Sequence, residues 1–450
     1  MSRRFLSVLL CVYASGFIFS ADSDPQPDSS PSPAPTATGE VTQVPLDPLL
    51  QQSDLWGPVT ADFSTACKTM GFRWISTAQD TAQSVKKGLT LFNITVNQAI
   101  VRFAQGKPTE IGILFYNRGD AGELTRPAFE ALKKQCADAI TGFTKVNPTE
   151  RGKDPTNAVR ATGLIWQTGA SQFLLEDSFT KTVEIPFRAE FIRLTVTPLE
   201  KPKGMLEQSL TEFHSSSIKF SGLDHVKTLP NGDVYIDGIP MVDQGDKGYC
   251  VVASAERVIR YYGGKADEHE LAEIANSSAE KGTSVPAMLD SLKKLSQRLR
   301  IKVRTIDDID DKGFENMITE YNRAAQHGRR AQQVSPAGED SLTDLFEKMD
   351  PEILREARTK NPSGMDRFFR LVQTHINQGI PPLWSVMIGI LKEPKDPKGF
   401  GGHMRLIIGY NDKTKEIIYS DSWGMGHEMK RMPLSDAWTI TMGLDAIEPL

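Results

Sequence analysis

The sequence predicts an α+β protein with two globular units, and three observations support this. The chain has 450 residues, which is more than a single hydrophobic core usually accommodates. Hydrophobic residues make up 39% and charged residues 24%, a balance typical of soluble folded domains. Patterns typical of β-hairpins and of amphipathic helices occur together in both halves.

The first twenty residues (1–20) have the pattern of a signal peptide. Arg3 and Arg4 precede an apolar stretch of about 15 residues, after which the chain becomes acidic and polar. This stretch is shorter than the roughly 20 residues that span a bilayer, so we expect cleavage, with an uncleaved anchor as the alternative. Residues 21–45 are rich in Ser, Pro and Asp and predict a disordered tether. We therefore expect a secreted or periplasmic protein without a stable membrane anchor.

Residues 46–200 predict a first, smaller α+β unit. Strand patterns at 91–96 and 100–103 are followed by a turn and a returning strand at 111–116, and an amphipathic helix is expected over 127–143. The unit contains no histidine and no recognisable catalytic cluster. A cell-surface target bound by this unit is a candidate partner, and if the protein is a non-catalytic binding module, this unit would perform the recognition.

Two cysteines of this unit, Cys67 and Cys136, fall on predicted helices. In an exported protein they can form a disulfide, and two separate buried thiols are an equally good interpretation. A poorly patterned, charged connector is expected over 201–224, and the second unit over 225–450.

Cys250 is predicted to lie in the first turn of a helix. The apolar residues after it follow helical spacing up to Tyr262, where two glycines stop the run. Free backbone N–H groups and the positive end of the helix dipole lower the pKa of a thiol there. Gln244 lies six residues upstream, and Gly245 and Gly248 permit a turn that returns its amide toward the thiol, as an oxyanion hole requires. A buried structural cysteine is the alternative.

His403 begins a predicted strand that ends at Tyr410, and a second strand returns from Glu416 after a polar turn. If Tyr410 and Glu416 flank the turn, facing residues have numbers that sum to about 826, which brings Asp421 near His403. A carboxylate beside an imidazole fixes its tautomer, and Trp423 can shield that hydrogen bond from water. A histidine on the surface is the alternative for this residue alone.

Taken in order, Gln244, Cys250, His403 and Asp421 resemble the papain-like cysteine peptidase superfamily. Its members have a glutamine six residues before a cysteine at a helix start, then a histidine and an Asn or Asp on consecutive strands. The 153 residues from Cys250 to His403 are close to the superfamily's usual interval of about 130–150. The DSWG sequence at 421–424 looks like the family's NSWG. The run from Gln378 onward is more similar to the bacteriocin-processing, double-glycine peptidase-like branch.

This resemblance implies a helix bearing the cysteine, packed on an antiparallel sheet that bears the histidine and the aspartate. Cys250 would be the nucleophile, His403 the general base and acid, and Asp421 the group that orients His403. Gln244 would complete the oxyanion hole. Lys247 and Val251 depart from papain itself, which has a disulfide cysteine and an aromatic residue there.

Three other polar residues near these motifs receive structural interpretations. His269 and His427 are expected on the surface, and Asp243 is expected to solvate its loop, with contact to the active loop as the less favoured alternative.

Composition narrows the remaining functions. The net charge is −5, or −7 without Arg3 and Arg4, which argues against a nucleic-acid binder. Four cysteines without a CxxC pair give no zinc pattern, so we expect neither a metal nor a cofactor. The favoured function is an exported cysteine peptidase acting on a peptide or protein. A transglutaminase-like acyl transferase and a non-catalytic binding module on the same fold are the alternatives.

Overall fold

The structure is a computed structural model that describes residues 42–52, 54–59, 65, 67–152, 159, 161–199, 220–245, 248–265, 267–277, 282–337, 341–393 and 399–450. The expected signal peptide (1–20) lies outside these residues, as do most of the expected tether and connector. The tether was predicted to extend to residue 45, but Val44–Pro45 form a strand that pairs in parallel with Leu89 and Thr90. The folded part therefore begins earlier than the composition indicates.

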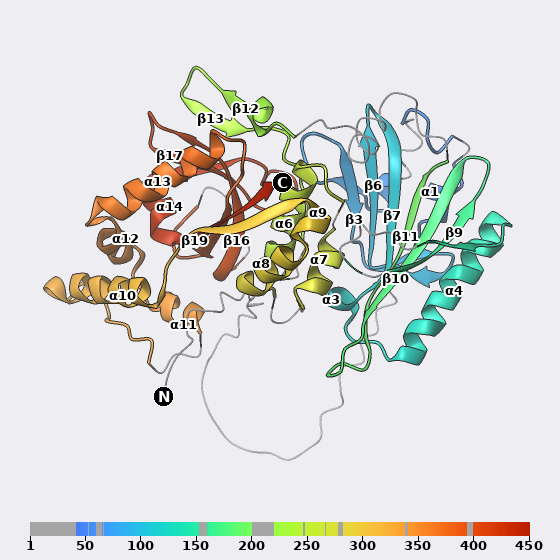
Figure 1. Cartoon of the computed structure of the whole chain (residues 1–450), viewed down its shortest axis with the longest axis horizontal. Coiled ribbons are helices and arrows are strands. Elements are labelled where there is room, and N and C mark those ends of the chain that lie inside the picture. The colour runs from blue at the N-terminus through green and yellow to red at the C-terminus, as the bar shows by residue number, and fades with distance from the viewer. Residues whose placement is uncertain are drawn as a thin grey trace, which may run out of the picture.

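The N-terminal unit is built on an antiparallel sheet (Figure 1). Among the described residues this sheet has eight strands in the order β2-β3-β6-β7-β11-β10-β9-β8, beside a small sheet of β1, β4 and β5. The elements are β1 Val44–Pro45, α1 Asp47–Leu50, β2 Arg73–Trp74, β3 Thr81–Ser84, β4 Leu89–Leu91, β5 Ile94–Thr95, β6 Gln98–Ala104, β7 Lys107–Asn117, α3 Arg118–Ala121, α4 Arg126–Thr144, β8 Thr149–Glu150, β9 Thr162–Gln167, β10 Ser171–Thr180 and β11 Arg188–Pro198.

The long helix of this unit is confirmed, and one predicted strand is wrong. Helix α4 begins after Thr125, whose side chain accepts a hydrogen bond from the Ala128 N–H, and it buries one apolar face against the sheet. The expected strand over 91–96 is instead a tight hairpin between β4 and β5. Phe92 and Asn93 adopt φ of 54° and 59° at its turn, a left-handed conformation that ends a strand.

The C-terminal unit surrounds a second sheet, ordered β12-β13-β16-β15-β19-β14, with β17 paired to β16 and β18 paired to β17. Its elements are η2 Gly222–His225, β12 Val226–Thr228, β13 Asp233–Ile236, α6 Cys250–Tyr261, α7 Glu268–Ile274, α8 Val285–Lys294, α9 Ser296–Leu299, β14 Ile301–Asp308, α10 Asp311–Gln326, η3 His327–Arg329, α11 Leu342–Glu347, α12 Pro351–Thr359, α13 Pro362–Ile376, β15 Leu383–Ile388, β16 Gly401–Asn411, β17 Glu416–Ser420, β18 Lys430–Pro433, α14 Leu434–Ile440 and β19 Thr441–Pro449.

Helix α6 is the central helix of this unit, because it packs against both α7 and β16 and nearly all its residues are buried. The region 301–377 begins with β14, which pairs antiparallel to β19 at the sheet edge, and it continues with helices α10 to α13.

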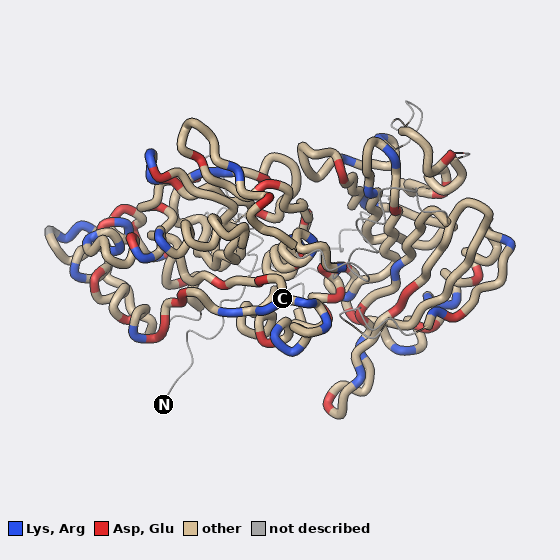
Figure 2. The backbone as a smooth tube through the Cα atoms, turned by 45° about the horizontal axis from the view of Figure 1, so that its top comes forward, with Lys and Arg blue, Asp and Glu red and all other residues tan. Residues whose placement is uncertain are grey.

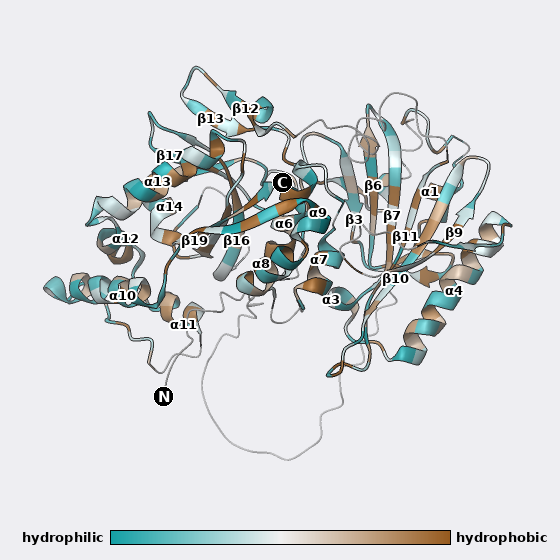
Figure 3. Ribbon diagram, in the orientation of Figure 1, coloured by the Kyte–Doolittle hydropathy of each residue, from teal (hydrophilic) through white to brown (hydrophobic). Residues whose placement is uncertain are grey.

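Each sheet has its own hydrophobic core, which confirms an α+β architecture. Hydrophobic residues lie along strands β7, β11 and β16, whereas helix α10 is largely hydrophilic (Figure 3). Basic and acidic residues are interspersed along the backbone of both units (Figure 2). Among the described helices, none combines the length and the apolar character needed to cross a bilayer.

Candidate active site

Cys250 is the first residue of helix α6, as predicted. Tyr249 precedes the helix, and Gly263, at φ 82°, lies just beyond its end. The Cys250 side chain is fully buried. At this position the first-turn N–H groups and the helix dipole act on the sulfur.

The segment that carries Gln244 is joined to the DSWG sequence. The Gln244 N–H donates to the Ser422 carbonyl at 2.9 Å, and Asp243 forms an antiparallel bridge with Trp423. Gly245 adopts φ of 67°, a left-handed conformation that favours glycine. The structure thus brings Gln244 next to the strand end that carries Asp421, and Gln244 is fully buried.

His403 and Asp421 are brought together. The imidazole Nε2 lies 3.2 Å from Asp421 Oδ1, and both side chains are buried. The Trp423 ring stacks on the imidazole, with centroids 4.5 Å apart and planes inclined by 19°. The predicted shielding by Trp423 is therefore present as a ring stack.

The pairing of β16 with β17 differs from the prediction close to the turn. Tyr410 pairs with Ile417 rather than Glu416, a shift of one residue. A bulge between Ile407 and Gly409 absorbs the extra residue, and beyond it the predicted register is restored. The carboxylate that follows the second strand therefore still reaches the imidazole.

The C-terminal unit contains the part of the chain that matches a known protein family. Residues 236–444 match the model of the Peptidase_C39 like family. This segment covers a little under half of the chain and contains all four predicted site residues. It confirms the relationship to papain-like and C39 cysteine peptidases for this part of the chain, and the family suggests cysteine peptidase activity. No curated protein matches the chain.

Within the C39-like segment, Asp421 belongs to a buried ionic cluster that the sequence prediction missed. Arg405 Nε donates to Asp421 Oδ1 at 2.8 Å, and Lys430 Nζ donates to Oδ2 at 2.8 Å. Arg405 also binds both oxygens of Glu393, and the Tyr419 hydroxyl donates to Glu393 at 2.7 Å. A signal for Arg405 existed, because residues two apart on a strand share a face, and Arg405 lies two residues after His403.

Burial and these charges shift the pKa values of Asp421 and His403. Burial alone would raise the pKa of Asp421, but Arg405, His403 and Lys430 together hold it well below its ordinary value. Burial lowers the pKa of His403, and the Asp421 carboxylate only partly offsets this. The carboxylate therefore stays ionised, while the buried imidazole favours its neutral form.

Arg257 connects helix α6 to the same strand end. Its Nη2 donates to the Ser420 hydroxyl at 2.6 Å, its Nη1 to the Ser422 hydroxyl at 3.4 Å, and its Nε to the Pro240 carbonyl at 2.9 Å. Burial lowers the pKa of Arg257 to about 10. The two serines flank Asp421, so Arg257 holds the carboxylate-bearing segment against the helix of Cys250.

Two of these polar residues are buried. His269 lies buried on α7, and Asp243 is buried with its Oδ1 accepting from the Gly245 N–H at 3.1 Å. The predicted exposure of His269 is wrong, because the N-terminal unit covers α7. Asp243 binds its own loop, as predicted, and the DSWG segment covers it. His427 is only partly buried, with its ring 5.5 Å from that of Trp423.

The cysteines differ in state. Cys67 and Cys136 are separate free thiols, and burial raises their pKa to about 11 and about 12. Cys250 is disulfide-bonded. A nucleophile must be a free thiolate, so chemistry at Cys250 requires the reduced protein.

Among the described residues, no group of three His, Cys, Asp or Glu side chains is arranged to hold a metal ion.

Proposed function

We propose that this chain is an exported cysteine peptidase that hydrolyses peptide bonds through Cys250, His403 and Asp421. The observation that carries the proposal is the buried His403–Asp421 pair under Trp423, in the same C39-like segment as a cysteine at a helix start. A structural cysteine needs no such pair on the facing sheet.

The chemistry would proceed in two steps. With Nε2 facing Asp421, the other ring nitrogen of His403 would take the Cys250 proton, and the thiolate sulfur would attack the peptide carbonyl carbon. The Gln244 amide and the Cys250 N–H would donate to the oxyanion. His403 would return the proton to the departing amine, which leaves a thioester on Cys250. Water, deprotonated by His403, would then release the acid and regenerate the thiol.

The test is a mass-spectrometric assay of the reduced, purified chain on a mixed peptide library, with and without an amine acceptor. Hydrolysed peptides that are lost in Cys250→Ser but kept in Cys67→Ser support the proposal. Cys67 is the matched control, because it is a free thiol outside the C39-like segment. Products that carry the amine would identify an acyl transferase instead. An unchanged library would favour a non-catalytic binding module.

We also propose that residues 1–20 direct export, so that the protein is secreted or periplasmic and acts on a peptide or protein there. A cell-surface target bound by the N-terminal unit is a further proposal. Fractionation of the producing cells tests both, because a cytoplasmic, uncleaved chain would contradict export, and an exported chain recovered only in the medium would contradict a surface target.

A further inference from the structure

The residues directly before Cys250 contact the N-terminal unit through Tyr249. Tyr249 directly precedes Cys250 and is buried. A Cβ atom built on Gly119 of α3 would lie 2.1 Å from the Tyr249 hydroxyl oxygen and 2.7 Å from its Cζ atom. Gly119 does not have a positive φ, so its backbone conformation does not require glycine. The requirement at this position is space for the tyrosine ring.

A chain of hydrogen bonds leads from the neighbouring residue to the same segment. Arg118 Nη2 donates to the Ser277 carbonyl, and Arg118 also pairs with Glu190 at 3.1 Å. The Thr283 hydroxyl contacts the Ser277 hydroxyl at 2.8 Å and the Gly248 carbonyl at 3.4 Å. Gly248 lies two residues before Cys250, so the N-terminal unit is coupled to the backbone next to the thiol.

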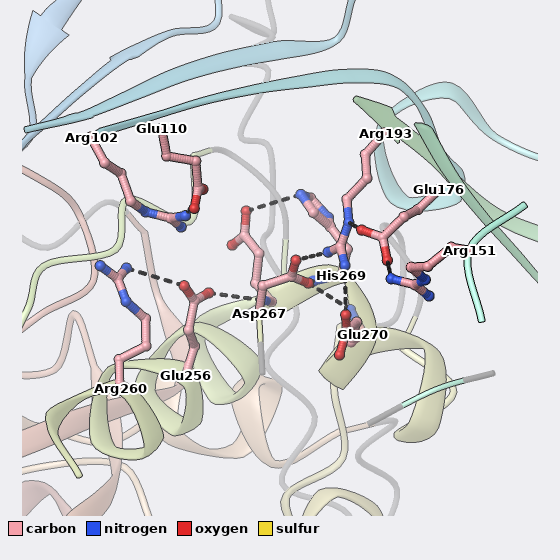
Figure 4. A network of polar contacts seen from close by, with 11 residues as sticks. Arg102, Glu110, Arg151, Glu176, Arg193, Glu256, Arg260, Asp267, His269 and Glu270 are labelled. Atoms are coloured by element: carbon pink, nitrogen blue, oxygen red, sulfur yellow. Dashed lines mark hydrogen bonds and ion pairs between the residues drawn. The ribbon is translucent and has the colours of Figure 1, made fainter. Parts of the chain in front are cut away.

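Helix α7 is held between the two units (Figure 4). Arg193 of β11 binds Glu176 at 2.9 Å within its own unit, and it pairs with Asp267 and with Glu270 across the interface, the latter at 2.7 Å. On its other side, α7 packs on α6, and the Glu268 N–H donates to Glu256 at 2.8 Å. The N-terminal unit therefore supports the helix that begins at Cys250.

Strand β2 and the loop after it contact both segments of the Asp243–Trp423 bridge region. The Thr77 N–H donates to Glu428 at 2.9 Å, just after the DSWG sequence. Arg73 lies 3.7 Å from Asp243, next to Gln244. Arg73 is largely exposed, so water and salt screen this second contact, and it contributes little.

We propose that the N-terminal unit is a positioning part of the active site, which holds Gly248 and Tyr249, directly before Cys250, through the contact of Gly119 with Tyr249. This inference rests on the proposed peptidase function. An oxyanion hole depends on donors placed within fractions of an ångström, and a glycine so close to the Cys250 N–H cannot supply that rigidity alone. The contacts from Gly119 and Arg118 supply it from outside the C39-like segment.

The test compares Gly119→Ala with Gly142→Ala in the full, reduced chain. Gly142 is the matched control, because it lies on α4 with no atom near its added Cβ. A shift of about 1 Å in a catalytic segment costs about 100-fold in rate, so we expect kcat to fall about 100-fold in Gly119→Ala with KM nearly unchanged. We also expect faster amide hydrogen exchange over 244–252 and slower alkylation of Cys250. Gly142→Ala should behave as wild type in all three measurements.

A second pair keeps the proposal testable if Gly119→Ala does not fold. Thr283→Val removes the contact with Gly248 at nearly constant volume, and Thr319→Val, on the exposed face of α10, is its control. Wild-type exchange over 244–252 and wild-type alkylation in the folded variants would overturn the proposal. Exchange and alkylation need no substrate. If the wild type hydrolyses no peptide, the peptidase function fails while these two measurements still decide the positioning role.

Discussion

Arg405 and Asp421 form a fully buried ion pair, with Arg405 Nε 2.8 Å from the same Asp421 oxygen that faces His403. Papain-like enzymes commonly have a neutral asparagine at this position, so a bare carboxylate would be a large change in charge. Here Arg405 and Lys430 partly compensate that charge. The cations explain how Asp421 can occupy an asparagine position.

Asp421→Asn should therefore lower stability more than a simple isosteric change. It removes one of the two carboxylates that balance Arg405 and Lys430, the other being Glu393, and loss of one partner from a buried pair costs about 3–5 kcal/mol. The free energy of unfolding in urea measures this, with Asp412→Asn, at an exposed turn, as the control. An unchanged unfolding midpoint in Asp421→Asn would contradict the buried cluster.

The same variant should also change how stability and activity depend on pH. Because the folded-state pKa of Asp421 is lowered, its stabilising contribution is complete above about pH 3.9 and is lost as the pH falls further. The acid loss of stability should be smaller in Asp421→Asn. In the folded variant the imidazolium loses a negative neighbour, so the basic limb of kcat/KM should move to lower pH. Urea titrations at several acid pH values and a pH–rate profile measure the two effects.

Gln244→Ala should lower kcat with little effect on KM. Removal of one oxyanion donor costs about 2.7–4 kcal/mol in transition-state stabilisation, whereas the bound substrate carries no such charge. Gln373→Ala, on the exposed side of α13, is the control. A higher KM with kcat retained would make Gln244 a substrate contact instead.

Glu273 on α7 should make the interface between the units sensitive to alkaline pH. Burial raises its pKa to about 8, although the Ser178 hydroxyl, which donates to it at 2.6 Å, partly offsets this. A carboxyl whose pKa is raised in the folded state contributes stability that is lost as the pH rises from about 4.3 to 8. Glu273→Gln should therefore be more stable than wild type at pH 8. A thermal melt at pH 5 and pH 8 measures this, and equal responses of both proteins would contradict it.

Local patterns predicted the site better than its surroundings. Cys250 was placed at a helix start because the apolar spacing and the glycines after Tyr262 are both local signals. His403 and Asp421 were brought together by the hairpin, although the bulge near Ile407 has no readable signal and shifted the register at the turn. The predicted strand through Phe92 failed because a phenylalanine in the left-handed region is uncommon and gives no turn signal.

Most of the structural features that could not be predicted from the sequence depend on contacts between residues far apart in the chain. His269 was expected on the surface because its environment is provided by the N-terminal unit, far away in the chain. The contact of Gly119 with Tyr249 likewise joins residues 130 positions apart, and nothing near either residue indicates the other. Arg405 was also missed, but here a local signal existed, because its position two residues after His403 puts it on the same face of the strand.

The link between Cys250 and His403 is tested most directly by the alkylation rate of Cys250 at pH 6, in the reduced wild type and in His403→Ala. An ordinary thiol with a pKa near 8.5 is only about 0.3% thiolate at that pH. The proposed nucleophile should react much faster with iodoacetamide than free cysteine does, and His403→Ala should lose that advantage while remaining folded. Cys67 and Cys136, whose pKa values are raised, should stay slow in both proteins and serve as internal references. Equal rates at Cys250 in the two proteins, close to that of free cysteine, would contradict an activated thiol paired with His403.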